Sequence, residues 1–309
     1  MSPQIFVCGA TGTQGGATAR HLRAADVTVH ALVRDTSSPK AQALEALGVK
    51  LFPGNYDDAE SLKAALAGCT GIFLNFSPSF TDFTQETRHA KTVIAAAKEA
   101  GVKHAAYASV LGHDELPELL ASSGLVVATA FIQSKHDNFN AVVEAGFDTW
   151  TRLQPGKFMG DFIAPGVPMF PDLGGSGIWE SGIRAEDEIR LVDPDDIGIV
   201  SAAALLDPEK YNGQKVDIFS QIVNPVELVK TLAKVSGKKI GIEFLPEEEL
   251  NARIATNVYL LGQRLTRYSG LGIPLETAKK WGSKCQTFEN FLLREKATVD
   301  STFANVPSA

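Results

Sequence analysis

A run of glycines directly after a short apolar segment is the feature that most limits how this chain can fold. Residues 5–8 are Ile-Phe-Val-Cys, and glycines then recur every third residue at Gly9, Gly12 and Gly15. The pattern predicts a buried strand, a sharp turn and the start of a helix. Glycine lets the backbone turn and lets a phosphate approach the free N–H groups of the helix's first turn. The alternative interpretation is a tight turn that binds nothing.

The first half of the chain alternates between strand and helix patterns. Strands are expected over residues 27–33, 49–52, 71–76, 103–108 and 147–153, and helices over 40–47, up to 67, over 84–100 and up to 145. The alternation predicts an α/β fold with a doubly wound parallel sheet. Asn75 and Ser109 follow two of these strands. We therefore expect both residues at the carboxyl edge of the sheet, where open α/β sheets bind ligands.

The end of the second strand bears on the choice of nucleotide. In a βαβ unit that binds a dinucleotide, this point reaches the adenosine ribose, where an acidic residue accepts from the 2′-hydroxyl and an Arg accommodates a 2′-phosphate. Arg34 comes first here, followed by Asp35 and by the hydroxyl residues 36–38. Arg34 favours NADP(H) over NAD(H). Asp35 keeps NAD(H) open, and a solvated loop charge is the other interpretation of Arg34.

Composition excludes several classes of function. The 309 residues are 44% hydrophobic and 21% charged, with a formal net charge of −7 and no basic tract. Direct nucleic-acid binding is therefore not expected. The three cysteines are scattered, as buried thiols in a reducing compartment would be. No apolar run approaches the ~18 residues of a membrane span, and no signal peptide is recognised. We expect a cytoplasmic or nuclear protein that does not bind membranes.

Two groups of polar residues are interpreted as structural. His113 lies on a loop without metal-ligand spacing around it, so a surface histidine is expected there. Asp193, Asp195 and Asp196 surround Pro194 at the start of a helix. Helix capping explains these carboxylates better than a metal site or acid–base chemistry.

Several motifs together resemble the NmrA-like family of atypical short-chain dehydrogenases, which is close to the isoflavone-reductase-like enzymes. They are the Gly-Ala-Thr-Gly-x-Gln-Gly run at residues 9–15, Arg34, a Ser-Lys pair at 134–135, residues 151–159, and Val-Asp-x-x-Asp-Ile-Gly at 192–198. The resemblance spans residues 4 to about 245. It implies a Rossmann domain that binds NADP(H) and a smaller, mixed α/β C-terminal lobe that closes over a substrate cleft. We expect the NADP(H)-binding domain at 1–155, mainly the substrate-binding lobe at 156–296, with elements that return to the sheet, and a frayed tail at 297–309.

The resemblance also implies which residues serve the cofactor. Lys135, expected in the first turn of its helix, would hold the nicotinamide ribose. The expected catalytic residues are Lys135 and Ser109, where Ser109, placed at the edge of the sheet by its strand, is expected to serve as a hydrogen-bond partner. The expected cofactor-binding residues are Gly9, Thr11, Gly12, Thr13, Gln14, Gly15, Arg34, Asn75, Phe76 and Lys135.

One position departs from the pattern of hydride-transferring short-chain dehydrogenases. These enzymes place a tyrosine four residues before the lysine as proton donor, and Phe131 stands there in this chain. Phe131 has no hydroxyl, so the usual acid is missing. Tyr107 ends the fifth strand, but no motif supports it as a substitute. An epimerase or dehydratase acting on a nucleotide-linked sugar is disfavoured, since those reactions need the tyrosine.

A segment rich in proline and glycine at residues 163–176 is interpreted as a flap that faces the substrate. Aromatic and thioether side chains in and around it would form an apolar wall, with Met169 and Phe170 among the candidates. An inert loop whose aromatic residues pack inward is the alternative. The expected substrate-binding residues are Phe131, Phe158, Met159, Phe162 and Trp179.

These observations predict an NADP(H)-dependent oxidoreductase that reduces a small apolar metabolite such as an imine, a quinone or an enone. The rival prediction is an NADP(H)-binding redox sensor without turnover, which would bind a transcription factor through its C-terminal lobe. Lys135 and the apolar flap favour an enzyme, and Phe131 favours a sensor.

Overall fold

The computed structural model describes residues 3–79, 81–121, 126–170, 172–254 and 256–309. The chain divides into two compact units. The first comprises Met1–Pro155 and Ile197–Ile218, and the second comprises Gly156–Asp196 and Phe219–Ala309. No helix within the described ranges is long and apolar enough to cross a membrane.

The first unit is built on a seven-stranded sheet in the order β10-β6-β5-β4-β1-β2-β3, in which every neighbouring pair is parallel. The predicted doubly wound parallel sheet is confirmed. Its strands are β1 (Gln4–Val7), β2 (Thr28–Val33), β3 (Lys50–Pro53), β4 (Gly71–Leu74), β5 (His104–Ala108), β6 (Thr149–Pro155) and β10 (Gln214–Ile218).

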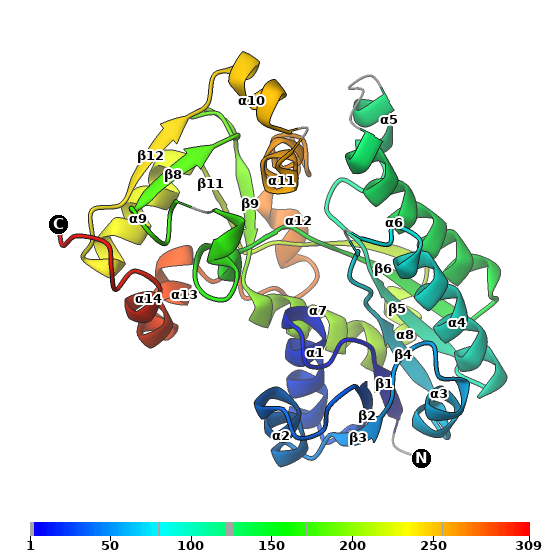
Figure 1. Cartoon of the computed structure of the whole chain (residues 1–309). Coiled ribbons are helices and arrows are strands. Elements are labelled where there is room, and N and C mark those ends of the chain that lie inside the picture. The colour runs from blue at the N-terminus through cyan, green and yellow to red at the C-terminus, as the bar shows by residue number, and fades with distance from the viewer. Residues whose placement is uncertain (1–2, 80, 122–125, 171, 255) are drawn as a thin grey trace. The chain divides into compact units, whose positions relative to one another are not determined.

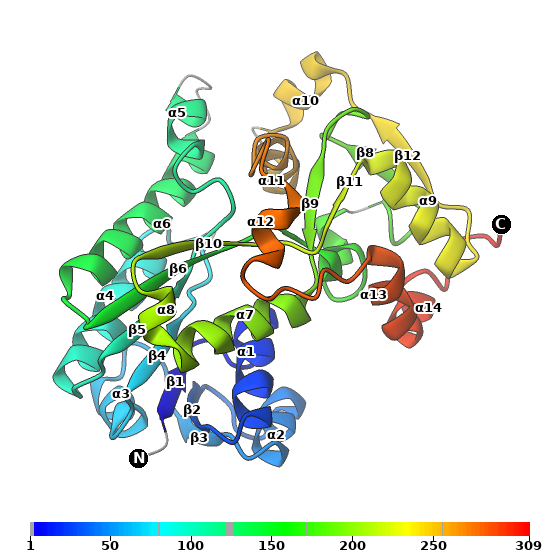
Figure 2. The same ribbon diagram turned by 180° about the vertical axis from the view of Figure 1, so that it is seen from behind.

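Helices cover both faces of this sheet, as Figures 1 and 2 show. One face carries α3 (Ala59–Leu66), α4 (Gln85–Glu99) and α6 (Val126–Glu144), and the other carries α1 (Thr13–Ala24), α2 (Pro39–Ala46) and α7 (Pro194–Leu206). Two short helices, α5 (Leu116–Ala121) and α8 (Pro208–Tyr211), complete the unit. The core on the first face includes Phe6, Leu62, Ile72, Tyr107 and Phe139. The strands are apolar because both of their faces are covered.

The second unit holds two small sheets. A three-stranded sheet has the order β11-β9-β7, and a two-stranded parallel sheet pairs β12 with β8. Its elements are β7 (Lys157–Phe158), η1 (Met159–Phe162), η2 (Val167–Met169), β8 (Ile178–Ser181), β9 (Ile189–Val192), β11 (Gln221–Val223), α9 (Pro225–Ser236), β12 (Gly241–Phe244), α10 (Glu247–Ile254), α11 (Val258–Thr266), α12 (Leu275–Lys279), α13 (Phe288–Arg294) and α14 (Lys296–Thr302).

The frayed tail expected over residues 297–309 is wrong. Helix α14 occupies most of this segment, and Val299, Phe303 and Val306 are at most 1% exposed in the core of the second unit. Ser308 then pairs with Lys238 in an isolated β-bridge. The small polar residues suggested disorder, but three well-spaced apolar side chains are enough to hold the segment in place.

Candidate functional site

The turn between β1 and α1 has the geometry that the three glycines predict. Gly9 adopts a φ of +62°, which is strained for other residues, and its carbonyl accepts from the N–H of Gly12 at 2.8 Å. A Cβ on Gly15 would lie 2.4 Å from the Gly9 oxygen and 2.6 Å from the Cys8 oxygen. Gly15 therefore allows α1 to pack closely against the end of β1.

The first turn of α1 keeps its N–H groups available. Gly12 is the N-cap and has no side chain to bond them, and the first turn contains no acidic residue. The positive end of the helix dipole is thus not neutralised from within α1. Thr11 is partly exposed and Thr13 is exposed beside this turn. The arrangement fits a dinucleotide diphosphate.

Gln14 and Asn75 join the glycine turn to the end of β4. Gln14 Nε2 donates to Asn75 Oδ1 at 3.2 Å. Gln14 Oε1 is buried, and no described residue donates a hydrogen bond to it. A buried acceptor without a partner costs free energy, so a donor on a bound nucleotide would relieve it. The site therefore fits the predicted cofactor.

Tyr56, which the sequence analysis did not single out, also contacts the turn. Its hydroxyl accepts from the N–H of Gly9 at 2.8 Å, and its ring packs edge-on against Phe76 at 5.7 Å between centroids. Burial raises the pKa of Tyr56 well above its usual value, so it stays a neutral phenol. No motif marks this tyrosine, since it lies on a loop in a different βα unit.

In the loop after β2, the two residues that bear on the choice between NADP(H) and NAD(H) have different surroundings. Arg34 is exposed. Asp35 Oδ1 instead accepts from the N–H and the hydroxyl of Ser37, at 2.8 and 2.6 Å. These bonds lower the pKa of Asp35. Ser38 caps α2 by accepting from Ala41 N. Asp35 and the serines therefore hold the loop together, while Arg34 extends into solvent.

Lys135 lies within a buried polar cluster rather than at the start of a helix. Helix α6 already includes Val126, so the expected first-turn position of Lys135 is wrong. Its ammonium Nζ lies 2.6 Å from Glu86 Oε1 and donates to the Phe76 carbonyl at 3.1 Å. The Lys135 residue is 5% exposed and the Glu86 residue 2%.

Glu86 is the central acceptor of this cluster and was missed from the sequence. Besides Lys135, it accepts from Ser134 Oγ at 3.0 Å and from Asn138 Nδ2 at 3.4 Å. An acidic residue in the first turn of α4 is explained locally by the helix dipole, so the sequence offered no separate signal. The two contacts of Lys135 use two of its three N–H donors.

Phe131 lies beside Lys135, with Nζ 5.8 Å from its ring centroid. Tyr107 does not replace the missing acid. Its hydroxyl is fully buried and donates to the backbone carbonyl of Lys135 at 3.3 Å. Burial raises the pKa of Tyr107 well above its usual value.

Ser109 is bonded to a histidine that the sequence analysis placed at the surface. Ser109 Oγ lies 2.5 Å from His113 Nδ1, and the two residues are 3% and 1% exposed. The expected surface position of His113 is therefore wrong. Burial, with nearby Arg152, lowers the pKa of His113 to about 3, so the ring is neutral. His136 stacks on it at 3.8 Å between centroids.

The aromatic residues expected to form a substrate wall are mostly core residues of the second unit. Met159, Phe162 and Trp179 are at most 1% exposed and belong to one hydrophobic cluster. Phe158 is only partly exposed. The wall expected from Met159, Phe162 and Trp179 is thus wrong for this structure. These side chains pack inward because burial of large aromatic surfaces stabilises a small unit.

Capping accounts for only part of the 193–196 cluster. Asp193 Oδ1 accepts from Asp195 N at 2.9 Å, as a cap does. The Asp193 carboxylate also binds both terminal nitrogens of Arg294 at 2.8 Å. Asp196 accepts from Ser220 Oγ and from Lys284 N, each at 2.6 Å. These carboxylates connect distant segments of the second unit, which no spacing rule predicts.

Comparisons with known proteins agree with the architecture. The sequence model of the NmrA-like family matches residues 1–305. The NmrA-like family domain-containing oxidoreductase FrzB of Cladobotryum sp. is 29% identical over 258 residues, which cover 77% of this chain and 75% of that protein.

Two solved structures are similar with a TM-score of 0.73 each. Triphenylmethane reductase of Citrobacter sp., complexed with NADP(H), is 22% identical, covering 94% of this chain and 99% of that one. The negative transcriptional regulator Nmra, in complex with NAD, is 21% identical, covering 96% of this chain and 97% of that one. At this level of identity the likeness establishes the fold.

Proposed function

Because this chain belongs to the NmrA-like family, we propose that it is an NADP(H)-dependent reductase of a small apolar imine, quinone or enone. The observation that carries the proposal is the glycine turn, where Gly15 lies against the Gly9 carbonyl and Gln14 Oε1 is buried without a donor among the described residues. Two relatives point the same way, since FrzB is named an oxidoreductase and triphenylmethane reductase is complexed with NADP(H).

Each residue near this turn has a proposed role. The N–H groups of α1 and the hydroxyl residues Thr11 and Thr13 would bind the diphosphate, and exposed Arg34 would bind the 2′-phosphate. Asn75 and Gln14 would position the nucleotide from the end of β4. The third N–H donor of Lys135 would bind the nicotinamide ribose, while Glu86 and the Phe76 carbonyl orient the ammonium group.

The nicotinamide supplies a hydride when it is bound. Reduction of a protonated imine needs only this hydride, because the nitrogen already carries its proton. Reduction of a quinone or an enone needs one further proton. With Phe131 in the position of the usual acid, that proton would come from water or Lys135. This is why we propose these substrate classes rather than simple ketones. Ser109 would donate a hydrogen bond to the substrate.

The experiment incubates the purified protein with NADPH and a panel of quinones, imines and enones, and follows the loss of NADPH absorbance. Lys135→Ala is compared with Lys91→Ala, which removes an exposed lysine from α4. The double variant Lys135→Met with Glu86→Gln keeps the buried cluster neutral in case Lys135→Ala fails to fold. Turnover that the Lys135 variants reduce and Lys91→Ala preserves would support the reductase.

A regulatory function is the second candidate, because Phe131 lacks the hydroxyl of the usual acid and Lys135 is already paired with Glu86. The structural neighbour Nmra is named a negative transcriptional regulator. In this case the chain would bind NADP(H) as a redox sensor and contact a transcription factor. Tight NADPH binding, with no turnover of any panel member and no effect of the Lys135 variants, would favour the sensor.

A further inference from the structure

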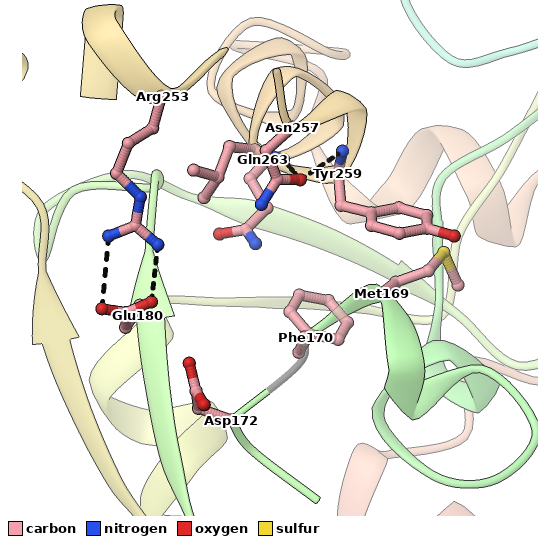
Figure 3. A pocket seen from close by; sticks show the side chains of 9 residues that line it. Met169, Phe170, Asp172, Glu180, Arg253, Asn257, Tyr259 and Gln263 are labelled. Carbon is pink, nitrogen blue, oxygen red and sulfur yellow. Dashed lines mark hydrogen bonds and ion pairs between the residues drawn. The ribbon is translucent and has the colours of Figure 1, made fainter. Parts of the chain in front are cut away.

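The second unit contains a pocket of about 100 Å³ that none of the proposed roles uses (Figure 3). It lies among the loop that follows η2, strand β8 and helices α10 and α11. Its lining combines apolar, amide and charged side chains, among them Phe170, Tyr259, Asn257, Gln263, Asp172 and Arg253.

The amide group of Gln263 is held in one orientation. Gln263 Oε1 accepts from Trp179 Nε1 at 3.1 Å and from Gly182 N at 2.9 Å. Both partners are donors, so the oxygen must face them and the NH₂ group must face the other way. The residue is 4% exposed and lines the pocket. Its NH₂ group therefore faces away from Trp179 and Gly182.

Asn257 is fixed in the same manner at the start of α11. Its Oδ1 accepts from Tyr259 N at 3.0 Å and from Leu260 N at 3.3 Å, so Asn257 is the N-cap of this helix. The capping bonds turn Nδ2 away from the helix end. In Figure 3 the side chains of Asn257 and Gln263 both extend toward Phe170. The NH₂ groups of Asn257 and Gln263 therefore have fixed orientations, and both residues line one small cavity.

The charges around the pocket disfavour an anion. Arg253 is committed to two carboxylates, with Nη2 2.7 Å from Glu180 and Nη1 3.1 Å from Glu249. Its hydrogen bonds lower the pKa of Glu180, so that carboxylate is ionised at neutral pH. Asp172 adds a further carboxylate, which Figure 3 shows directed toward Glu180. A ligand that accepts from the amides must therefore do so with an uncharged oxygen.

The apolar side of the pocket suits a flat ring. Phe170 is 3% exposed, and the Phe162 ring stacks on it with centroids 4.8 Å apart. Lys157 Nζ also lies over the Phe170 ring, 5.3 Å from its centroid, and is paired with Asp161 Oδ2 at 2.8 Å. Tyr259 is 40% exposed, and Figure 3 shows its ring above Met169. A ring with a carbonyl substituent would contact these aromatic side chains and accept from the two amides.

We infer that this pocket binds an aromatic carbonyl ligand that is neutral or cationic, with its oxygen held by Nδ2 of Asn257 and Nε2 of Gln263. The inference goes beyond the proposed function and does not depend on it, because it rests on the second unit alone and requires no nucleotide.

The test compares benzamide with benzoate by calorimetry on the full chain. The two probes share a ring and differ in whether the acceptor oxygen is neutral or anionic. We expect the Kd of benzamide to be lower than that of benzoate by about tenfold or more. The cation 1-methylnicotinamide tests whether the carboxylates of Asp172 and Glu180 favour a positively charged ligand. It should bind more tightly than nicotinamide, and Asp172→Asn should remove this difference.

Asn257→Asp locates the binding site. Aspartate caps a helix as well as asparagine does, so α11 should form, but the donor pair is replaced by a charged oxygen. Benzamide affinity should fall by about tenfold. The matched control is Asn224→Asp, which makes the same change at the N-cap of α9, where Asn224 Oδ1 accepts from Glu227 N at 2.9 Å. This control should leave the affinity unchanged.

Equal binding of benzamide and benzoate, absence of benzamide binding, or an equal loss in the two Asn→Asp variants would each overturn the inference. Failure of the proposed function is distinguishable. A chain that does not bind NADPH would still bind benzamide if the pocket has the proposed specificity.

Discussion

Lys135 Nζ and Glu86 Oε1 lie 2.6 Å apart, and helices α6 and α4 bury both groups. Ser134 and Asn138 donate to the same carboxylate, and the Phe76 carbonyl accepts from the same ammonium. A buried pair of charges is tolerated only when each has such additional partners. Glu86 on α4 therefore holds Lys135 of α6, which is proposed to bind the cofactor, in place.

Glu86→Gln should destabilise the fold, because it leaves the Lys135 charge buried without a counter-charge. The expected loss in the free energy of unfolding is about 3 to 5 kcal/mol, measured by urea denaturation. Combining it with Lys135→Met should cost less than Glu86→Gln alone, since the second change removes the unpaired charge. A double variant less stable than both single variants would contradict a net electrostatic role for the pair.

Gly15→Ala should impair nucleotide binding through the backbone. The new Cβ would meet two carbonyl oxygens at 2.4 and 2.6 Å, so α1 must move away from β1. We expect a loss of about 1 to 3 kcal/mol in stability and a weaker NADPH affinity by calorimetry. The control Gly262→Ala lies in α11, where a Cβ meets nothing within 4 Å, and should be neutral or stabilising. NADPH affinity unchanged in Gly15→Ala would argue against the turn as the phosphate site.

Arg34→Ala should reduce the preference for NADPH over NADH. The exposed guanidinium is proposed to bind the 2′-phosphate, and a charge-assisted hydrogen bond of this kind is worth about tenfold in affinity. Titration of both nucleotides measures the ratio. Lys103→Ala removes an exposed positive charge just before β5, at the other end of the strands, and controls for the overall change of charge. An affinity ratio that Arg34→Ala leaves unaltered would show that the phosphate argument is wrong.

Asp217 should make stability depend on pH. Burial, together with the nearby charge of Glu115, raises its pKa from 3.8 to about 6. The folded chain therefore binds more protons than the unfolded chain between these values. The stability that this group contributes is complete below pH 4 and is lost as pH rises through 6.

Asp217→Asn should remove that loss, because the amide cannot ionise and can still accept from Gln154 Nε2, which now lies 3.1 Å from Asp217 Oδ1. After allowance for solvent screening, we expect the variant to be more stable than the parent by about 1 to 2 kcal/mol at pH 7.5 and equal to it near pH 4. Urea unfolding across this pH range tests the expectation. A stability difference that stays constant with pH would refute it.

Much of the first unit was predictable because its signals are local. Gly9, Gly12 and Gly15 predicted the turn, since a positive φ and close helix packing depend on the residues themselves. The alternation of apolar runs and helix patterns predicted the parallel sheet.

The predictions that were wrong concern residues whose burial cannot be inferred from short-range sequence patterns. His113 was expected in solvent, yet Ser109 and His136 hold it in the interior. The residues after 296 were expected to fray, yet Val299 and Phe303 enter the core. The His136 ring that stacks on His113, and the core around Val299 and Phe303, come from segments that the local pattern could not bring into contact.

The sequence by itself determined the nucleotide-binding type of sheet and the glycine turn, because backbone conformation and strand period depend on neighbouring residues. Only the tertiary structure decided that Glu86 pairs with Lys135, that Met159, Phe162 and Trp179 are core residues, and that Gln263 presents its NH₂ group to a pocket. Each of these depends on the approach of side chains from separate helices and strands, and their hydrogen bonds and burial exist only once the chain has folded.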